Sequence, residues 1–370
     1  MEIKEVKVEL VDKNSRFVLK KIITNKGEFY NRQLAVSNSI YACEKKRLIY
    51  GKALFDSIFQ TFHIMWNSDE EEWDFIGLKK AKEHSKNNGR IFIPYKQRNE
   101  KQWNELTWKE AEEEFKKFQK KVNIVPYPIP LNASLEEWRI KKKEALGLLE
   151  PNQKLISILS SKHHNINNFL LLVKEELKNS FFLGICCYGL STTLEKINLS
   201  LLNSINSSFN VEDKTALIGY FDYARMLMNH SNIAGSFAYS CFAGDFFSEK
   251  SYFIPRMSKK AREKMFNKKP EDFYFYDIKE KKFNKSLPQS GWYGFDLTRN
   301  SLKMISVNEG LTGYQTIKWI NHFLQQRDLK LINELLISKK NVLKSLKNYT
   351  GWNVFWDTIK PNSPEIQRTL

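Results

Sequence analysis

The sequence predicts an α/β fold: a (β/α)8 TIM-like barrel with irregular early units, followed by a small C-terminal appendage of helices and a hairpin. Apolar segments typical of strands begin at residues 122, 155, 182, 216 and 245, with steps of 33, 27, 34 and 29 residues. Each step is the length of one strand plus one helix. The segments are apolar throughout, as in a parallel sheet covered by helices. No glycine-rich phosphate turn follows the first strand, which argues against a doubly wound sheet.

The first 120 residues have a less regular pattern, and residues 29–120 have room for the three further strands that a barrel needs. Alternating and apolar segments predict strands, and a glycine ends the basic helix. The expected elements are strands VKVELV and FVLKKIIT, a turn at Asn25-Lys26-Gly27, a helical apolar pattern over 31–66, a basic helix over 79–88 and a strand at Ile91–Tyr95.

Two capping boxes mark the start of the regular units. Thr107 with Glu110, and Ser134 with Glu137, predict helices through residues 120 and 149. Later helices are expected over 165–178, 192–209 and 227–242. The alternation of strand and helix segments stops after residue 253, so we divide the chain into a barrel (1–253) and a basic C-terminal appendage (254–370). In the appendage we expect a hairpin-like segment FYFYDIKEKKF and a pair of helices, Tyr314–Gln326 and Leu329–Leu346.

Charge is the strongest functional signal. Lys and Arg number 59 against 42 Asp and Glu, a net charge of +17, which predicts a polyanionic partner such as DNA or RNA. Residues 79–101 and 256–285 each carry a net +6, and this clustering favours a binding face. A Lys-rich proteome remains the alternative explanation. The predicted nucleic-acid contacts are Lys79, Lys80, Arg90, Lys96, Arg98, Arg256, Lys259, Lys260 and Arg262.

Several classes of protein are disfavoured. The sequence has no run of eighteen apolar residues and begins MEIKEVK, so we expect no membrane span, no secretory signal and a cytoplasmic location. Phosphate-loop, zinc-protease and serine-hydrolase motifs are absent. Four cysteines without Cys-x-x-Cys spacing predict neither a disulfide framework nor a metal site, and no cofactor is indicated. Adjacent Cys186 and Cys187 are expected to be packing residues.

Candidate catalytic groups follow the strands, because a barrel assembles its active site at the carboxyl ends of its strands. Asp222 directly follows ALIGYF and is the expected base or nucleophile, with Glu249 as the second carboxylate. Asp245 is a further candidate, although its place at the start of a strand is more typical of a structural carboxylate. Arg225 could instead neutralise Asp222. The expected substrate-binding residues are Tyr95 and Tyr188, which would stack on a base, with Arg225 and His163.

Residues 107–252 resemble the tRNA-guanine transglycosylase superfamily, which includes DNA-modifying relatives. The resemblance is carried by ELTWKEAEEEFKKF before NIVPYPIP, by SLEEWRIKKKEAL, and by ALIGYF followed by AGDFF. It implies a (β/α)8 enzyme that exchanges a purine base for a 7-deazaguanine through a covalent aspartate–sugar intermediate.

The sequence departs from this family at three places. The Asp-Ser-Gly-Gly signature is missing, and the comparable IFIPYKQ has no carboxylate. Ser248 stands where the family has its nucleophilic aspartate. No cysteine follows Cys241, so the family's zinc site is absent and we expect the appendage to fold without zinc.

Three interpretations remain open. The first is a transglycosylase-like enzyme acting on a base in DNA or RNA, and the second is a non-catalytic subunit that keeps the barrel and binds nucleic acid while a partner supplies the chemistry. Whether the chain has a protein partner or forms a homodimer is left open. The third is a metabolic barrel whose charge has no binding role. A pair of strand-end carboxylates in one pocket would favour the enzyme over the non-catalytic subunit.

Overall fold

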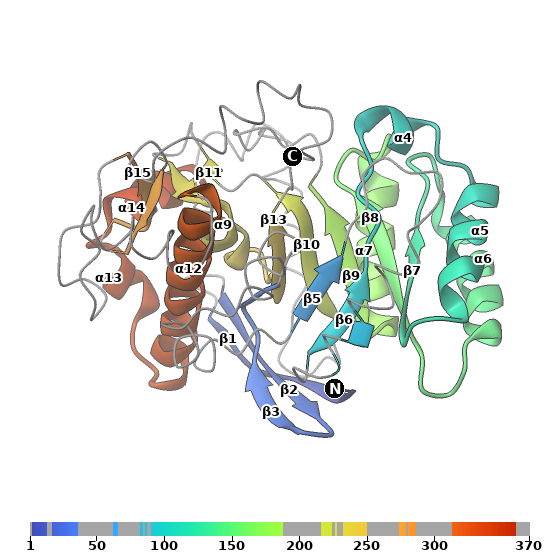
Figure 1. Cartoon of the computed structure of the whole chain (residues 1–370), viewed down its shortest axis with the longest axis horizontal. Coiled ribbons are helices and arrows are strands. Elements are labelled where there is room, and N and C mark those ends of the chain that lie inside the picture. The colour runs from blue at the N-terminus through green and yellow to red at the C-terminus, as the bar shows by residue number, and fades with distance from the viewer. Residues whose placement is uncertain are drawn as a thin grey trace.

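The centre of the molecule is a curved parallel sheet of six strands (Figure 1). The computed structural model describes residues 2–12, 17–35, 62–65, 82–83, 86, 90–187, 216–223, 226–227, 232–249, 274–278, 280–285 and 313–359. In spatial order the strands are β4 (Gln33–Leu34), β13 (Phe246–Glu249), β10 (Leu217–Tyr223), β9 (Phe182–Cys186), β8 (Lys154–Ser160) and β7 (Ile124–Pro128). The five strands predicted from residue 122 onward are all present.

A second parallel pair, β5 (Phe62–Met65) and β6 (Ile91–Pro94), lies beside this sheet. The helical pattern predicted over 31–66 is therefore wrong at both described parts of it that are strands, β4 and β5. The ring of Tyr95, directly after β6, stacks on Phe221 of β10 with centroids 4.6 Å apart. Four flat strand spacings would separate them by about 19 Å, so the strands curve around a shared interior. Within the described residues no backbone pairing joins β6 to β7 or β4 to β5, and the predicted closed barrel is not confirmed.

Helices cover the outer side of the sheet, and both predicted capping boxes are confirmed. Thr107 Oγ1 accepts from the Glu110 amide at 3.3 Å, and Ser134 Oγ accepts from the Glu137 amide at 3.2 Å. Such caps satisfy amides that have no partner inside the helix. The helices are α4 (Glu100–Asn104), α5 (Trp108–Gln119), α6 (Leu135–Leu148) and α7 (Ile166–Asn179).

An antiparallel sheet covers the amino ends of the parallel strands, at the bottom of Figure 1. The predicted first two strands are confirmed. The ammonium of buried Lys20 donates to the carbonyl of Ala216, the residue before β10, at 3.0 Å. This contact closes the lower end of the interior. The antiparallel strands are β1 (Ile3–Asp12), β2 (Phe17–Thr24) and β3 (Gly27–Tyr30).

The C-terminal part packs directly on the parallel sheet. Gln326 Oε1 accepts from the Leu34 amide of β4 at 2.6 Å. The predicted helix pair is wrong, because residues 327–328 contain no helix breaker and α12 (Gly313–Ile337) continues through them. The smaller elements are α9 (Gly235–Ser240), α13 (Val342–Leu346), α14 (Thr350–Ile359) and the four-stranded sheet of β11 (Met226–Leu227), β12 (Ile233–Ala234), β15 (Lys282–Asn284) and β14 (Phe275–Asp277). Among the described helices none has the length and hydropathy to span a bilayer.

Candidate functional site

Asp222 has an unusual backbone at the carboxyl end of β10. Its φ is 55°, in the left-handed region, and the pairing of β10 with β13 shifts register there, between Phe221 and Tyr223. A left-handed conformation costs most residues with a Cβ about 1–2 kcal/mol, although Asp and Asn adopt it more readily than the others. A bulge of this kind redirects a side chain, and Asp222 is the redirected residue.

Contacts on either side of the bulge show which way Asp222 turns. Phe221 stacks on Tyr95 in the interior, whereas Tyr220 and Tyr223 pack on Tyr239 of α9 on the outer side. Strict alternation would put Asp222 outside with Tyr220. Instead its carboxylate lies inside, where Tyr95 Oη donates to Oδ2 at 2.6 Å. The strained backbone thus turns a carboxylate into the interior.

The surroundings of Asp222 are buried. Asp222 is 2% exposed and Tyr95 is fully buried. The Cys186 thiol, at the end of β9, lies 3.8 Å from Asp222 Oδ2 and 3.2 Å from Tyr95 Oη. Burial, reinforced by the charge of Asp222, raises the pKa of Tyr95 well above its usual value. The phenol therefore stays protonated at neutral pH and serves as a donor to the carboxylate.

Two side-chain oxygens at the same edge of the sheet are buried without a partner. Gln97, three residues after β6, and Ser161, directly after β8, have no hydrogen-bond partner for Oε1 and Oγ, respectively, among the described residues. Buried polar atoms nearly always have a partner in folded proteins. A bound ligand would supply hydrogen bonds to both.

Glu249 does not join Asp222 as predicted. Phe246 packs on Phe221 in the interior with ring centroids 5.9 Å apart, and Phe247 packs on Tyr223 outside with centroids 6.4 Å apart. Alternation along β13 therefore puts Ser248 on the inner face and Glu249 on the outer one. The expected carboxylate pair is not supported.

Asp245 lies at the opposite, amino edge of the sheet. It is fully buried, and Oδ2 accepts from Lys20 Nζ at 2.6 Å and from the Ile218 amide at 2.7 Å. Oδ1 accepts from Asn31 Nδ2 at 2.8 Å. Burial lowers the pKa of Lys20, against the opposing effect of Asp245. Asp245 is a structural carboxylate, and a catalytic role beside Asp222 is not supported.

Two other predicted site residues have structural partners. The amide of Asn165 donates to His163 Nδ1 at 3.2 Å, and His163 Nε2 lies 3.1 Å from the Ala133 carbonyl. Burial lowers the pKa of His163, so the ring is neutral and links two loops rather than binding substrate. Arg98 is 3% exposed, pairs with Glu114 and lies over the ring of Trp103. A contact of Arg98 with nucleic acid is not supported.

The basic segment 79–101 does not form one face. Arg90 precedes β6 at the amino edge of the sheet, and Lys96 follows β6 at the carboxyl edge. Six residues of extended chain span about 20 Å. Lys96 is half-buried, and burial lowers its pKa. The remaining predicted residues, Tyr188, Arg225, Lys79, Lys80, Arg256, Lys259, Lys260 and Arg262, lie outside the described residues.

Cys186 was expected only to pack, and its place beside Asp222 was not predicted. The alternation of FLGIC was a usable signal, because it puts Gly184 and Cys186 on the face that Phe221 covers. In the part of the chain that the structure describes, no group of three potential metal ligands is present.

Comparison with models of known protein families and with curated proteins gives no match. Any function must therefore be argued from the site itself.

Proposed function

We propose that this chain is a transglycosylase-like enzyme that exchanges a guanine base for a 7-deazaguanine in DNA or RNA, with Asp222 as its nucleophile. The single observation that carries the proposal is the strained, buried Asp222 carboxylate at the carboxyl end of β10. Backbone strain of this kind persists where surrounding structure imposes it, and it concentrates at functional sites.

A closed (β/α)8 barrel is part of this proposal, and two observations support it. Among the described parallel strands the first in the sequence, β4, pairs with the last, β13. In a closed barrel the first and last strands are neighbours. The hydrogen bond from Tyr95, after β6, to Asp222, in β10, crosses the interior of the curve. Asp222 would then lie at the mouth where barrel enzymes bind substrate.

The proposed chemistry uses the charge and position of Asp222. Its carboxylate attacks C1′ of the sugar, the glycosidic bond breaks, and the guanine leaves with a proton taken up from solvent or a neighbouring donor. The N9 atom of a 7-deazaguanine then attacks C1′ and loses its proton to solvent or to a neighbouring acceptor, and the bond from C1′ to the aspartate breaks, which restores the carboxylate. The base must leave the helical stack to reach a buried group. The oxygens of Gln97 and Ser161 would accept hydrogen bonds from it.

The direct test is release of labelled guanine from DNA and from RNA by the full chain. Asp222→Asn keeps the shape and the acceptor for Tyr95 but removes the charge, so we expect exchange to fall at least about a hundredfold. Binding to nucleic acid should persist in this variant and weaken steeply with salt, as expected for several phosphate contacts. Wild-type turnover in Asp222→Asn would refute the role of Asp222.

The second candidate is a non-catalytic subunit that binds nucleic acid while a partner supplies the chemistry. It is favoured by Ser248, which lies where a second inward carboxylate would be expected. Wild-type protein that binds DNA or RNA with a steep salt dependence but releases no guanine would support this candidate. An affinity for DNA and RNA that does not change with salt would argue against both candidate functions.

A further inference from the structure

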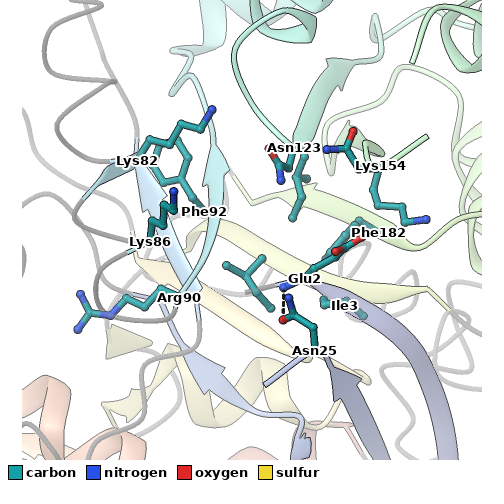
Figure 2. Close-up of a pocket in the computed structure, with 13 residues that line it drawn as sticks. Glu2, Ile3, Asn25, Lys82, Lys86, Arg90, Phe92, Asn123, Lys154 and Phe182 are labelled. Carbon is teal, nitrogen blue, oxygen red and sulfur yellow. Dashed lines mark hydrogen bonds between the residues drawn. The ribbon is translucent and has the colours of Figure 1, made fainter. Parts of the chain in front are cut away.

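A separate pocket opens at the amino edge of the parallel sheet, at the opposite ends of the strands from Asp222. It has a volume of about 420 Å³ and lies between the antiparallel sheet and the first residues of β6 to β9. Figure 2 shows Lys82 and Lys86 on one side, Asn123 and Lys154 on the other, and Glu2 with Asn25 between them.

The lining of this pocket is basic. Lys82, Lys86, Arg90 and Lys154 line it, and Glu2 is the one carboxylate among the described lining residues. Figure 2 shows the guanidinium of Arg90 directed away from the pocket. The ammonium of Lys82 donates to the Lys121 carbonyl at 2.5 Å, and that of Lys154 lies 4.4 Å from the centre of the Phe181 ring. Both partners are uncharged, so these contacts hold the lysines in place without neutralising them.

The pocket also has aromatic and amide groups in its lining. Its volume lies in the range typical of small-molecule sites, about 300–1,000 Å³. The partly buried ring of Phe92 lines it, and Asn123 and Asn152 supply amide groups that can donate or accept. Positive charge beside an aromatic ring and amides suits a phosphate attached to an organic group better than a bare anion.

We propose that this pocket binds a phosphate monoester carried by a nucleoside, either a free nucleotide or the phosphorylated end of a nucleic-acid strand. Lys82 and Lys86 contact the phosphate, and the Phe92 side contacts the base or sugar. The site is independent of the exchange reaction proposed for Asp222. It gives a role to the amino-edge half of the basic segment 79–101, which lies too far from Asp222 to serve that site.

The test is titration of the full chain with AMP, with adenosine and with inorganic phosphate at low salt, followed by calorimetry. We expect AMP to bind at least about tenfold more tightly than adenosine, because charged hydrogen bonds to phosphate contribute most of the affinity. Phosphate alone should bind more weakly than AMP. An oligonucleotide with and without a 5′ phosphate then separates a strand end from a free nucleotide as the natural source.

The decisive variant is Lys82→Ala with Lys86→Ala, which should weaken AMP binding at least about tenfold. The matched control is Lys143→Ala with Lys174→Ala, which removes the same charge from exposed positions on α6 and α7. This control and Asp222→Asn should both leave AMP binding unchanged. The proposal is overturned if AMP binds no better than adenosine, or if the pocket variant and the control behave alike.

Discussion

Asp222 and Asp245 are two buried aspartates on neighbouring strands, and their surroundings differ in charge and in backbone. Asp245, just before β13 at the amino edge, has ordinary backbone and accepts from a lysine, an asparagine and a main-chain amide. Asp222, at the carboxyl edge, has a left-handed backbone, a phenol donor and a nearby thiol. Burial alone therefore does not distinguish a structural carboxylate from a functional one. The two aspartates differ in the charge of their partners and in the strain of their backbone, and the functional role proposed for Asp222 rests on that difference.

The largest loss of stability should come from disrupting the hydrogen bonds around Asp245 at the amino edge. Lys20→Met leaves the charge of Asp245 buried without its cation, which typically costs about 3–5 kcal/mol. Urea unfolding should show a loss of that size. The exposed Lys7, paired with Glu5, provides the control, and Lys7→Met should change stability by less than about 0.5 kcal/mol. A loss below about 1 kcal/mol in Lys20→Met would show that Asp245 is not held by this pair.

At the carboxyl edge, the phenol of Tyr95 should matter for both folding and function. Tyr95→Phe keeps the stack on Phe221 and removes the donor to Asp222, so we expect a stability loss of about 1.5–3 kcal/mol. We expect base exchange to fall about tenfold as the carboxylate loses its fixed position.

Tyr220 is a suitable comparison, since its hydroxyl donates to the Phe242 carbonyl at 2.8 Å on the outer side of the sheet. Tyr220→Phe should cost about 1 kcal/mol of stability and leave exchange unchanged. Equal losses of exchange in the two variants would mean that Tyr95 acts only through packing.

The smallest expected effect concerns His163. Its folded pKa is lowered, so the unfolded chain binds more protons than the folded one as pH falls through the usual histidine value of about 6.5. Stability from this residue is present above that pH and decreases below it. Because the ring is partly exposed, His163→Gln should reduce the loss of stability between pH 7 and 5 by only a few tenths of a kcal/mol. If stability depends on pH in the same way in His163→Gln and in wild type, the ring is not held neutral by the fold.

Local patterns in the sequence predicted much of this fold. The strand at Leu217–Tyr223 and the helix capped by Ser134 follow from apolar runs and a capping box, which depend on neighbouring residues. The strand at Phe62–Met65 was missed because a segment of four residues with three apolar side chains fits a helix and a strand equally well. The continuous α12 was missed because helix propensity is a weak signal over a few residues, although residues 327–328 contain no helix breaker. Asp328 lies within the helix and accepts from Tyr276 and Lys281, which are far from it in the sequence.

The candidate site was predicted less completely, for a physical reason. Asp222 was visible because it ends an apolar strand. Its inward turn depends on a bulge, and its contact with Tyr95 joins residues 127 positions apart. Neither depends on a local pattern. Arg98 was misjudged for the same reason, since its partner Glu114 lies on α5, 16 residues along the chain.

The most direct test makes the same substitution in both aspartates and compares their free energies of unfolding. Asp222→Asn keeps the acceptor for Tyr95, removes a buried charge and suits the left-handed backbone, so stability should stay within about 1 kcal/mol of wild type or rise. Asp245→Asn leaves the charge of Lys20 buried without its anion, and the free energy of unfolding should fall by about 3–5 kcal/mol. The opposite order, with Asp222→Asn the more destabilised protein, would contradict the functional assignment of Asp222.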